Sequence, residues 1–286
     1  MSISKDLTSR EVANSEENLK TIRMFVRVMG VGFPFDNKIL NRTKMKLKTN
    51  EVHHWAALAS QGQGVPWFVG DPVCNCWLYN YKLLRPSIFI TALQMRSNTC
   101  GVKSVLYRGR PQVNADAVLC RRCRARPETC AHVLGYCSFG KPYRIKRHNE
   151  IVDLIISKIN IRGGAIKVMK EPEVVINGAP LKPDLIVVEE EAVYVIDVTV
   201  RYENEQSLFE AKREKEEKYQ SVANHLAGIF HRVASVAPVV VGSRGALPHF
   251  TVRTLERCGF VRADCVTTSL IALRTSMEMF HQFLDG

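Results

Sequence analysis

The sequence predicts an α/β fold for residues 147–286, preceded by a helical region and a small metal-binding knuckle. Three observations support this prediction. An amphipathic helical segment, several short β-type segments, a charged helical segment, another apolar strand and further helices follow one another, as in a mixed α/β domain. Cysteine and histidine residues cluster just before this domain. The chain has 286 residues, of which 46% are hydrophobic, so it can bury a packed core.

The patterning of the chain predicts the elements in order. Residues 1–20 are polar, and we expect them to be mobile. Residues 21–115 form a helical linker region, and residues 116–146 form the knuckle. The periodicity predicts helices over 50–62, 86–98, 146–159 and 204–230, strands over 165–169, 174–176, 184–188, 193–200 and 237–243, and helices from there to the end.

The composition favours an intracellular protein that binds a polyanion. The longest apolar runs are far shorter than the roughly 20 residues that cross a bilayer, and the opening lacks the apolar core of a secretory signal. Nine cysteines in such a chain favour thiols and metal ligands over disulfides. The net charge of +12 favours nucleic acid as a partner. We therefore expect no membrane partner.

Residues 120–137 contain a C-x2-C-x8-H-x4-C pattern, formed by Cys120, Cys123, His132 and Cys137. Two cysteines separated by two residues can chelate one ion, and a histidine and a cysteine close by can complete a tetrahedral zinc site. Cys130 is a rival ligand, but it would leave His132 without a role. The alternative is that the four residues are scattered buried thiols and a histidine without a metal. Cys74 and Cys76, with one residue between them, are interpreted as ordinary loop or core cysteines.

The basic residues concentrate around this pattern. Residues 101–150 hold eleven basic residues against three acidic ones. We expect seven of them to contact nucleic acid through its phosphates: Arg121, Arg122, Arg124, Arg126, Arg144, Lys146 and Arg147.

Asp184 and Asp197 lie at the start of one predicted strand and inside the next. A hairpin turning in the acidic run at 189–192 would bring the two carboxylates together. Two close carboxylates repel each other unless a cation lies between them, and Mg²⁺ is the expected ion. Glu150 could add a third acid or be a surface residue, whereas His148 is expected to pack or to contact phosphate.

The helix over 204–230 can supply a cation to the same place. Lys215, Lys218 and Tyr219 share one face of this helix by their i,i+3 and i,i+4 spacing, and Lys212 is a less favoured third lysine. Such a cation would stabilise the charge that develops in phosphodiester hydrolysis. The alternative is a solvated helix held by Glu–Lys pairs.

The segment KPDLIVVEEEAVYVIDVTV, residues 182–200, resembles the PD-(D/E)xK nuclease pattern, with Asp184 and Asp197 as its two acids. Thr199 stands where that pattern has its lysine. The same departure occurs in the restriction-like endonucleases of non-long-terminal-repeat retrotransposons that insert into ribosomal RNA genes, where the following helix supplies the lysine. KREKEEKYQ resembles that helix. The segment over 120–151 resembles the zinc knuckle and linking helix that these polyproteins place just before the nuclease.

The resemblance covers roughly residues 50–260 and implies the C-terminal region of such a polyprotein, namely linker, CCHC knuckle and restriction-like endonuclease. The sequence has no Asp-Asp pair, so the polymerase domain is expected to be absent. The implied activity is Mg²⁺-dependent nicking of target DNA in the nucleus, which primes reverse transcription, with a structural Zn²⁺. Asp184 and Asp197 would bind the metal, Lys215 or Lys218 would orient water or stabilise the transition state, and Tyr219 would position the water. Target DNA is the expected partner, and the element's RNA is a further candidate.

Two alternatives remain open at this point. The chain could be a catalytically silent module that binds nucleic acid through the knuckle and its basic surface. It could also be a cellular zinc-binding regulator without nuclease ancestry, in which the two aspartates would not pair.

Overall fold

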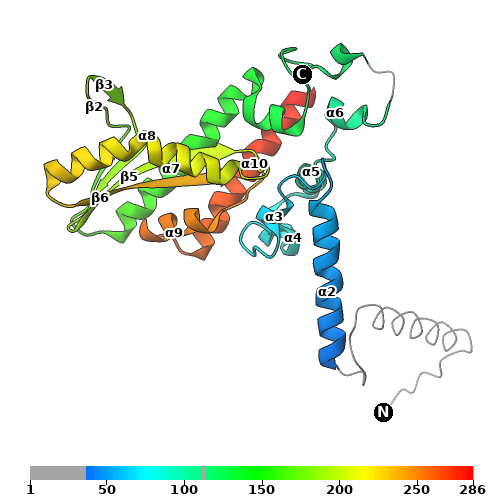
Figure 1. Ribbon diagram of the computed structural model, residues 1–286, viewed down its shortest axis with the longest axis horizontal. Helices are drawn as coiled ribbons and strands as arrows, with labels where there is room; N and C mark the ends of the chain where they lie inside the picture. The colour runs from blue at the N-terminus through cyan, green and yellow to red at the C-terminus, as the bar shows by residue number, and fades with distance from the viewer. Residues whose placement is uncertain (1–36, 111–113, 286) are drawn as a thin grey trace, which may run out of the picture. The chain divides into compact units, whose positions relative to one another are not determined.

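The computed structural model describes residues 37–110 and 114–285, and the chain divides into two compact units, residues 1–55 and 56–286. Helix α2 (Asn37–Ala56) is the described part of the first unit (Figure 1). Both ends of α2 lie earlier in the chain than those of the predicted helix 50–62. The helix stops at Ala56 because the following residues turn toward Gly64, which has a left-handed φ of 85°. The predicted mobile segment 1–20 lies outside the described residues.

The second unit begins with short helices and continues into an α/β domain. Its linker and knuckle elements are α3 (Val65–Phe68), α4 (Cys76–Tyr79), η1 (Tyr81–Leu83), α5 (Pro86–Arg96), α6 (Lys103–Leu106), η2 (Ala115–Val118), η3 (His132–Tyr136) and η4 (Ser138–Gly140). The domain elements are α7 (Lys141–Arg162), β1 (Lys167–Lys170), β2 (Val174–Ile176), β3 (Ala179–Leu181), β4 (Leu185–Val188), β5 (Ala192–Arg201), α8 (Ser207–Phe230), β6 (Val233–Gly242), α9 (His249–Arg257) and α10 (Arg262–Asp285).

The domain is built on a mixed sheet of four strands in the order β1-β4-β5-β6. β4 pairs antiparallel with β1 and β5, whereas β6 pairs parallel with β5 after the α8 crossover. β2 and β3 form a separate antiparallel hairpin that projects from the sheet in Figure 1. The predicted α/β class is therefore confirmed.

Helices cover both faces of the sheet. Alternate strand residues such as Ile196 and Val198 pack with Ile151 and Ile155 of α7 and with α9 and α10. The residues between them on the strands face α8, where Val195 joins the cluster that surrounds α8. Each large aliphatic side chain buried in this way contributes roughly 1.5–3 kcal/mol relative to exposure.

The linker and the knuckle have a core of their own, built against α10. Trp77 and Met95 of the linker and Leu134 of the knuckle share one buried cluster with Phe280 and Phe283. α10 thus belongs to both the knuckle core and the sheet core. All nine cysteines are free thiols, as predicted, and no helix in the described part of the chain is long and apolar enough to cross a membrane.

Candidate active site and metal centre

The first candidate site lies on the β4–β5 hairpin, which turns at residues 189–191 as the sequence predicts. Leu185 pairs with Ile196, so the same register places Asp184 opposite Asp197. Directly opposed residues lie on one face with Cβ atoms about 4.5–5.5 Å apart. Asp197 is buried, with 4% of its surface exposed. The hairpin therefore brings the two predicted carboxylates side by side on the face that α8 covers.

Lys215 of α8 forms an ion pair with this hairpin. It lies four residues after the buried Ala211 and four before the buried Tyr219, so the phase of the helix points it at the sheet. Its Nζ lies 2.6 Å from Asp197 Oδ2, and its side chain is 20% exposed. A carboxylate in a strand interior is costly to bury, and this ion pair offsets that cost.

Tyr219 holds the chain that leads into Asp184. Its hydroxyl donates to the carbonyl of Lys182 at 3.0 Å. Burial, followed by the charge of Asp197, raises the pKa of the hydroxyl far above its ordinary value, so it stays a neutral donor. Tyr219 therefore fixes the approach of residue 184 to the site.

The other sequence candidates lie elsewhere. Lys218 is exposed and places its Nζ 4.7 Å from the centre of the Tyr219 ring. Lys212 pairs with Glu216 at 2.5 Å. Within the described residues, Glu150 has no hydrogen bond or ion pair to either aspartate. Of the three lysines, the structure brings only Lys215 to the carboxylates.

The sequence predicts that His148 of α7 packs or contacts phosphate, but the structure places it against one of the two aspartates. Its Nε2 lies 3.1 Å from Asp184 Oδ2, and the hydrogen bond to this carboxylate raises the pKa of His148. The backbone N–H of Val198 donates to the same oxygen at 2.6 Å. One signal could have found it: His148 lies three residues before the buried Ile151, on the stripe of α7 that faces the sheet.

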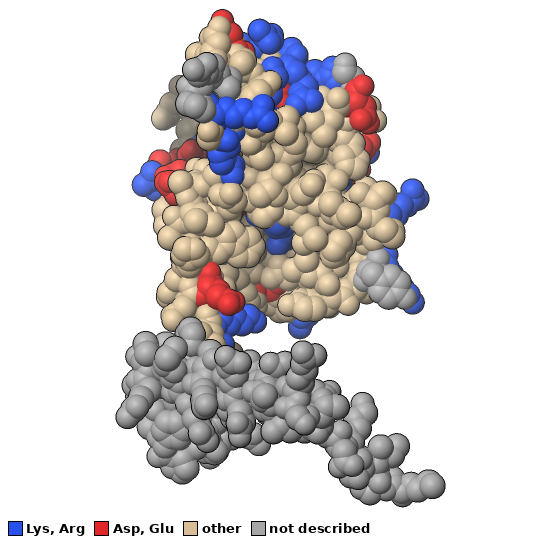
Figure 2. All heavy atoms as spheres, turned by 90° about the vertical axis from the view of Figure 1, so that its right-hand side faces the viewer, with Lys and Arg blue, Asp and Glu red and all other residues tan. Residues whose placement is uncertain are grey.

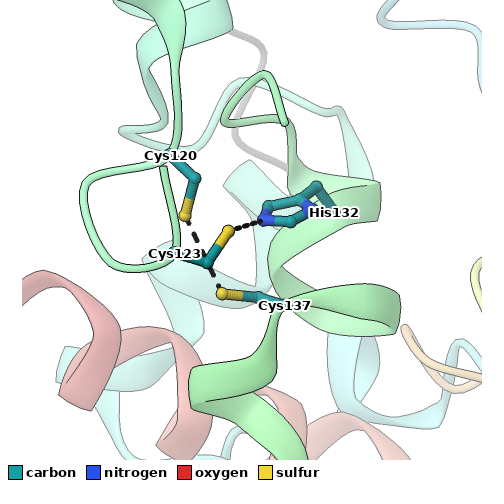
Figure 3. A group of neighbouring side chains, drawn as sticks. All are labelled: Cys120, Cys123, His132 and Cys137. Carbon is teal, nitrogen blue, oxygen red and sulfur yellow. Dashed lines mark hydrogen bonds between the residues drawn. The ribbon is translucent and has the colours of Figure 1, made fainter. Parts of the chain in front are cut away.

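The second candidate site is the knuckle, where the four predicted ligands converge (Figure 3). Their sulfur and nitrogen atoms all lie within 4.8 Å of one another. Cys120 Sγ and Cys137 Sγ are 3.8 Å apart, and Cys123 Sγ lies 3.2 Å from His132 Nε2. The edge of a tetrahedron with zinc–sulfur bonds is about 3.8 Å, so this group could bind a metal such as zinc.

The surroundings of the knuckle suit a metal centre. Burial lowers the pKa of His132, which favours the neutral imidazole that binds metals. Glu128, fully buried, fixes the loop by accepting hydrogen bonds from the backbone N–H of Arg121 at 2.7 Å and of Lys103 at 3.1 Å. Cys130, the rival ligand, is outside the group and lies beside Cys100 and Tyr202 in the core.

The predicted nucleic-acid contacts divide into engaged and exposed side chains. Arg122 donates to the carbonyl of Phe283 and Arg144 to that of Cys137, while Arg121 and Lys146 form ion pairs with Glu128 and Glu278. Arg124 and Arg126 are exposed, and their side chains have no hydrogen bond or ion pair to other described residues. Figure 2 shows Lys and Arg side chains gathered at the end where Figure 1 places α6.

Arg147 does not fit its predicted role as a nucleic-acid contact. Only 1% of its surface is exposed, and its Nη1 donates to Ser276 Oγ at 2.6 Å. Burial lowers the pKa of its guanidinium to about 10. Arg147 points from α7 toward α10, and its burial there shields the guanidinium from a phosphate. Its role is therefore to support the packing of the two helices.

Comparisons with known proteins agree on one group of relatives, although no family model matches the chain. The chain is 30% identical over 196 residues to a retrovirus-related Pol polyprotein from type-1 retrotransposable element R2 of Popillia japonica, which covers 64% of this chain and 41% of that protein. It is 26% identical over 211 residues to the Pol polyprotein from type-2 retrotransposable element R2DM of Drosophila melanogaster, covering 71% of this chain and 19% of that protein. The chain spans less than half the length of these relatives.

Proposed function

This chain is a homologue of the Pol polyproteins of R2-type non-long-terminal-repeat retrotransposons, and from that premise we propose that it is a metal-dependent DNA endonuclease. The observation that carries the proposal is the convergence of Asp184, Asp197 and Lys215 on one face of the hairpin. The order of helix, three antiparallel strands, helix and parallel strand supports a PD-(D/E)xK core. The reaction would nick target DNA in the nucleus and leave a 3′-hydroxyl that primes reverse transcription.

The donor set fits a hard divalent cation such as Mg²⁺. Such an ion takes one or two carboxylates and keeps several waters. Asp184 directs Oδ2 to protein donors, and its Oδ1 has no hydrogen bond to other described residues, so this oxygen is available to an ion. When bound, the ion would polarise the phosphodiester and lower the pKa of water.

Lys215 takes the role that the lysine of the pattern has elsewhere. Thr199 occupies that position on β5, but Lys215 reaches Asp197 from α8. Its ammonium group is held by the buried carboxylate and remains partly exposed, so it can face a phosphate that approaches the site. A cation placed there stabilises the negative charge that develops as the phosphodiester is attacked.

The test is nicking of supercoiled plasmid with Mg²⁺ or with EDTA, using Asp197→Asn and the control Asp153→Asn. Asp153 is an acid on α7 whose side chain is 61% exposed and pairs with Lys170 at the surface. We expect metal-dependent nicking by the parent chain and by Asp153→Asn, and a loss of at least about a hundredfold in Asp197→Asn. Equal nicking by the two variants, or nicking in EDTA, contradicts the proposal.

A second function is favoured by the exposed Arg124 and Arg126 beside the knuckle. We infer that a structural Zn²⁺ orders the loop that carries them, and that the loop binds the phosphates of target DNA or of the element's RNA. In the plasmid experiment, tight binding released by salt, without any nicking, would favour this function alone.

A further inference from the structure

We propose that His148 is a positioning residue of the nuclease site, which holds Asp184 so that its Oδ1 is left for the divalent cation. The inference rests on the proposed endonuclease function. It assigns a task to a side chain that lies 36 positions away from its partner in the sequence and belongs to a different element.

Two donors meet at one oxygen of Asp184. The N–H of Val198 donates to Oδ2 at 2.6 Å from β5, and His148 Nε2 lies 3.1 Å from the same atom on α7. The terminal torsion of an aspartate has a broad range, so one hydrogen bond leaves the carboxylate plane free to turn. Two donors from different elements fix that plane, and with it the position of Oδ1.

The histidine is itself held in place. Ile151, Val152 and Ile155 anchor the same helix in the sheet core, so the backbone that carries His148 is fixed. Asn149 Oδ1 lies 3.1 Å from the other ring nitrogen, Nδ1. The side chain of His148 is 31% exposed, while that of Asp184 is 16% exposed. The ring therefore closes one side of the carboxylate and leaves the site open to solvent.

α7 and α8 each engage one of the two aspartates. Lys215 of α8 pairs with Asp197, and His148 of α7 pairs with Asp184. Each carboxylate thus has one oxygen engaged by a helix. Residues that hydrogen-bond to a metal-binding carboxylate orient it, and their loss typically lowers metal affinity about tenfold to a hundredfold.

The experiment measures Mn²⁺ binding to the zinc-loaded full chain by titration calorimetry, without DNA. Four variants are compared with the parent: His148→Asn, His148→Gln, Asp197→Asn and the control His225→Ala, an exposed histidine on α8. Glutamine can place an N–H donor near the position of Nε2, whereas asparagine is too short to reach Asp184. We expect His148→Asn to weaken Mn²⁺ binding about tenfold to a hundredfold, and His148→Gln and His225→Ala to stay within about threefold of the parent.

The outcomes separate this inference from the proposed function. If His148→Asn binds Mn²⁺ like the parent while Asp197→Asn does not, the positioning role is wrong and the metal site stands. If the parent does not bind Mn²⁺ at all, both the metal site and the positioning role are wrong. Equal weakening in the asparagine and glutamine variants, with equal loss of thermal stability, would show a packing role and overturn the inference.

Discussion

At the scale of single residues, the phase of α8 decides which lysine reaches the carboxylates. Lys215 occupies the buried stripe between Ala211 and Tyr219, whereas Lys218 is one turn further and exposed. The ammonium group of Lys218 lies over the Tyr219 ring, 4.7 Å from its centre, whereas that of Lys215 lies 2.6 Å from Asp197 Oδ2. The geometry therefore separates two lysines that are three positions apart.

Lys215→Ala is expected to lower nicking by at least about a hundredfold, because it removes the cation that stabilises the developing charge. Lys218→Ala is the matched control on the same helix and should stay within about threefold. Plasmid nicking measures both rates. Binding of Mn²⁺ should persist in Lys215→Ala, since both carboxylates remain. Equal losses of nicking in the two variants would contradict the assignment.

The sequence predicts the residues whose partners are close along the chain. The four knuckle ligands follow from spacing within 18 residues, and the two aspartates follow from a short hairpin. It could not choose among the helix lysines or predict the contact of His148 with Asp184. It also placed Arg147 on the surface. These features depend on which face of a helix packs, and that is decided by α10 and by the sheet.

At the scale of elements, the local sequence pattern predicts most helices and strands of the domain, but it does not predict one of its shortest strands or its buried charged contacts. The helix predicted over 204–230 is observed as α8 (Ser207–Phe230), but β3 (Ala179–Leu181) has three residues and contains a proline, so its sequence does not predict a strand.

The linker is fixed by a contact that no local sequence pattern predicts. The loops after β5 and β6 bring together Glu203 and Arg244, both fully buried.

This ion pair ties the linker to the ends of the two parallel strands. Arg244 Nε lies 3.1 Å from Glu203 Oε2, and Nη2 donates to the carbonyl of Gln63 at 2.9 Å. Gly242 is required beside it, because a Cβ there would lie 2.1 Å from Glu203 Oε1. Arg244 thus holds the linker at Gln63 against the loops that follow β5 and β6.

Glu203→Gln is expected to lower the free energy of unfolding by about 3–5 kcal/mol, because it leaves the charge of Arg244 buried without its partner. The control is Glu278→Gln, which breaks an ion pair with Lys146 whose side chains are both 48% exposed, and it should cost about 1 kcal/mol or less. Urea unfolding measures both values. A cost below about 1 kcal/mol for Glu203→Gln would show that the pair does not secure the linker.

At the scale of the whole molecule, α10 connects the knuckle to the four-stranded sheet. Phe280 and Phe283 pack with Leu134 of the knuckle, and Ala272 packs in the sheet core. Cys120 and Cys137 are buried in the same cluster as these phenylalanines. Unfolding of the knuckle would therefore expose apolar surface on the helix that also supports the sheet.

Removal of the proposed zinc is expected to loosen the knuckle first and the end of α10 with it. Cys120→Ser should reduce bound zinc, lower the midpoint of thermal unfolding and open the chain to protease within residues 115–140, because a loop-rich segment held by a structural metal loses its folding energy with the metal. Cys76→Ser is the control, since Cys76 lies outside the ligand group. Metal analysis and limited proteolysis measure these effects. If Cys120→Ser keeps one zinc per chain and the parent's protease resistance, the knuckle folds on packing alone, and the coupling through α10 does not depend on metal.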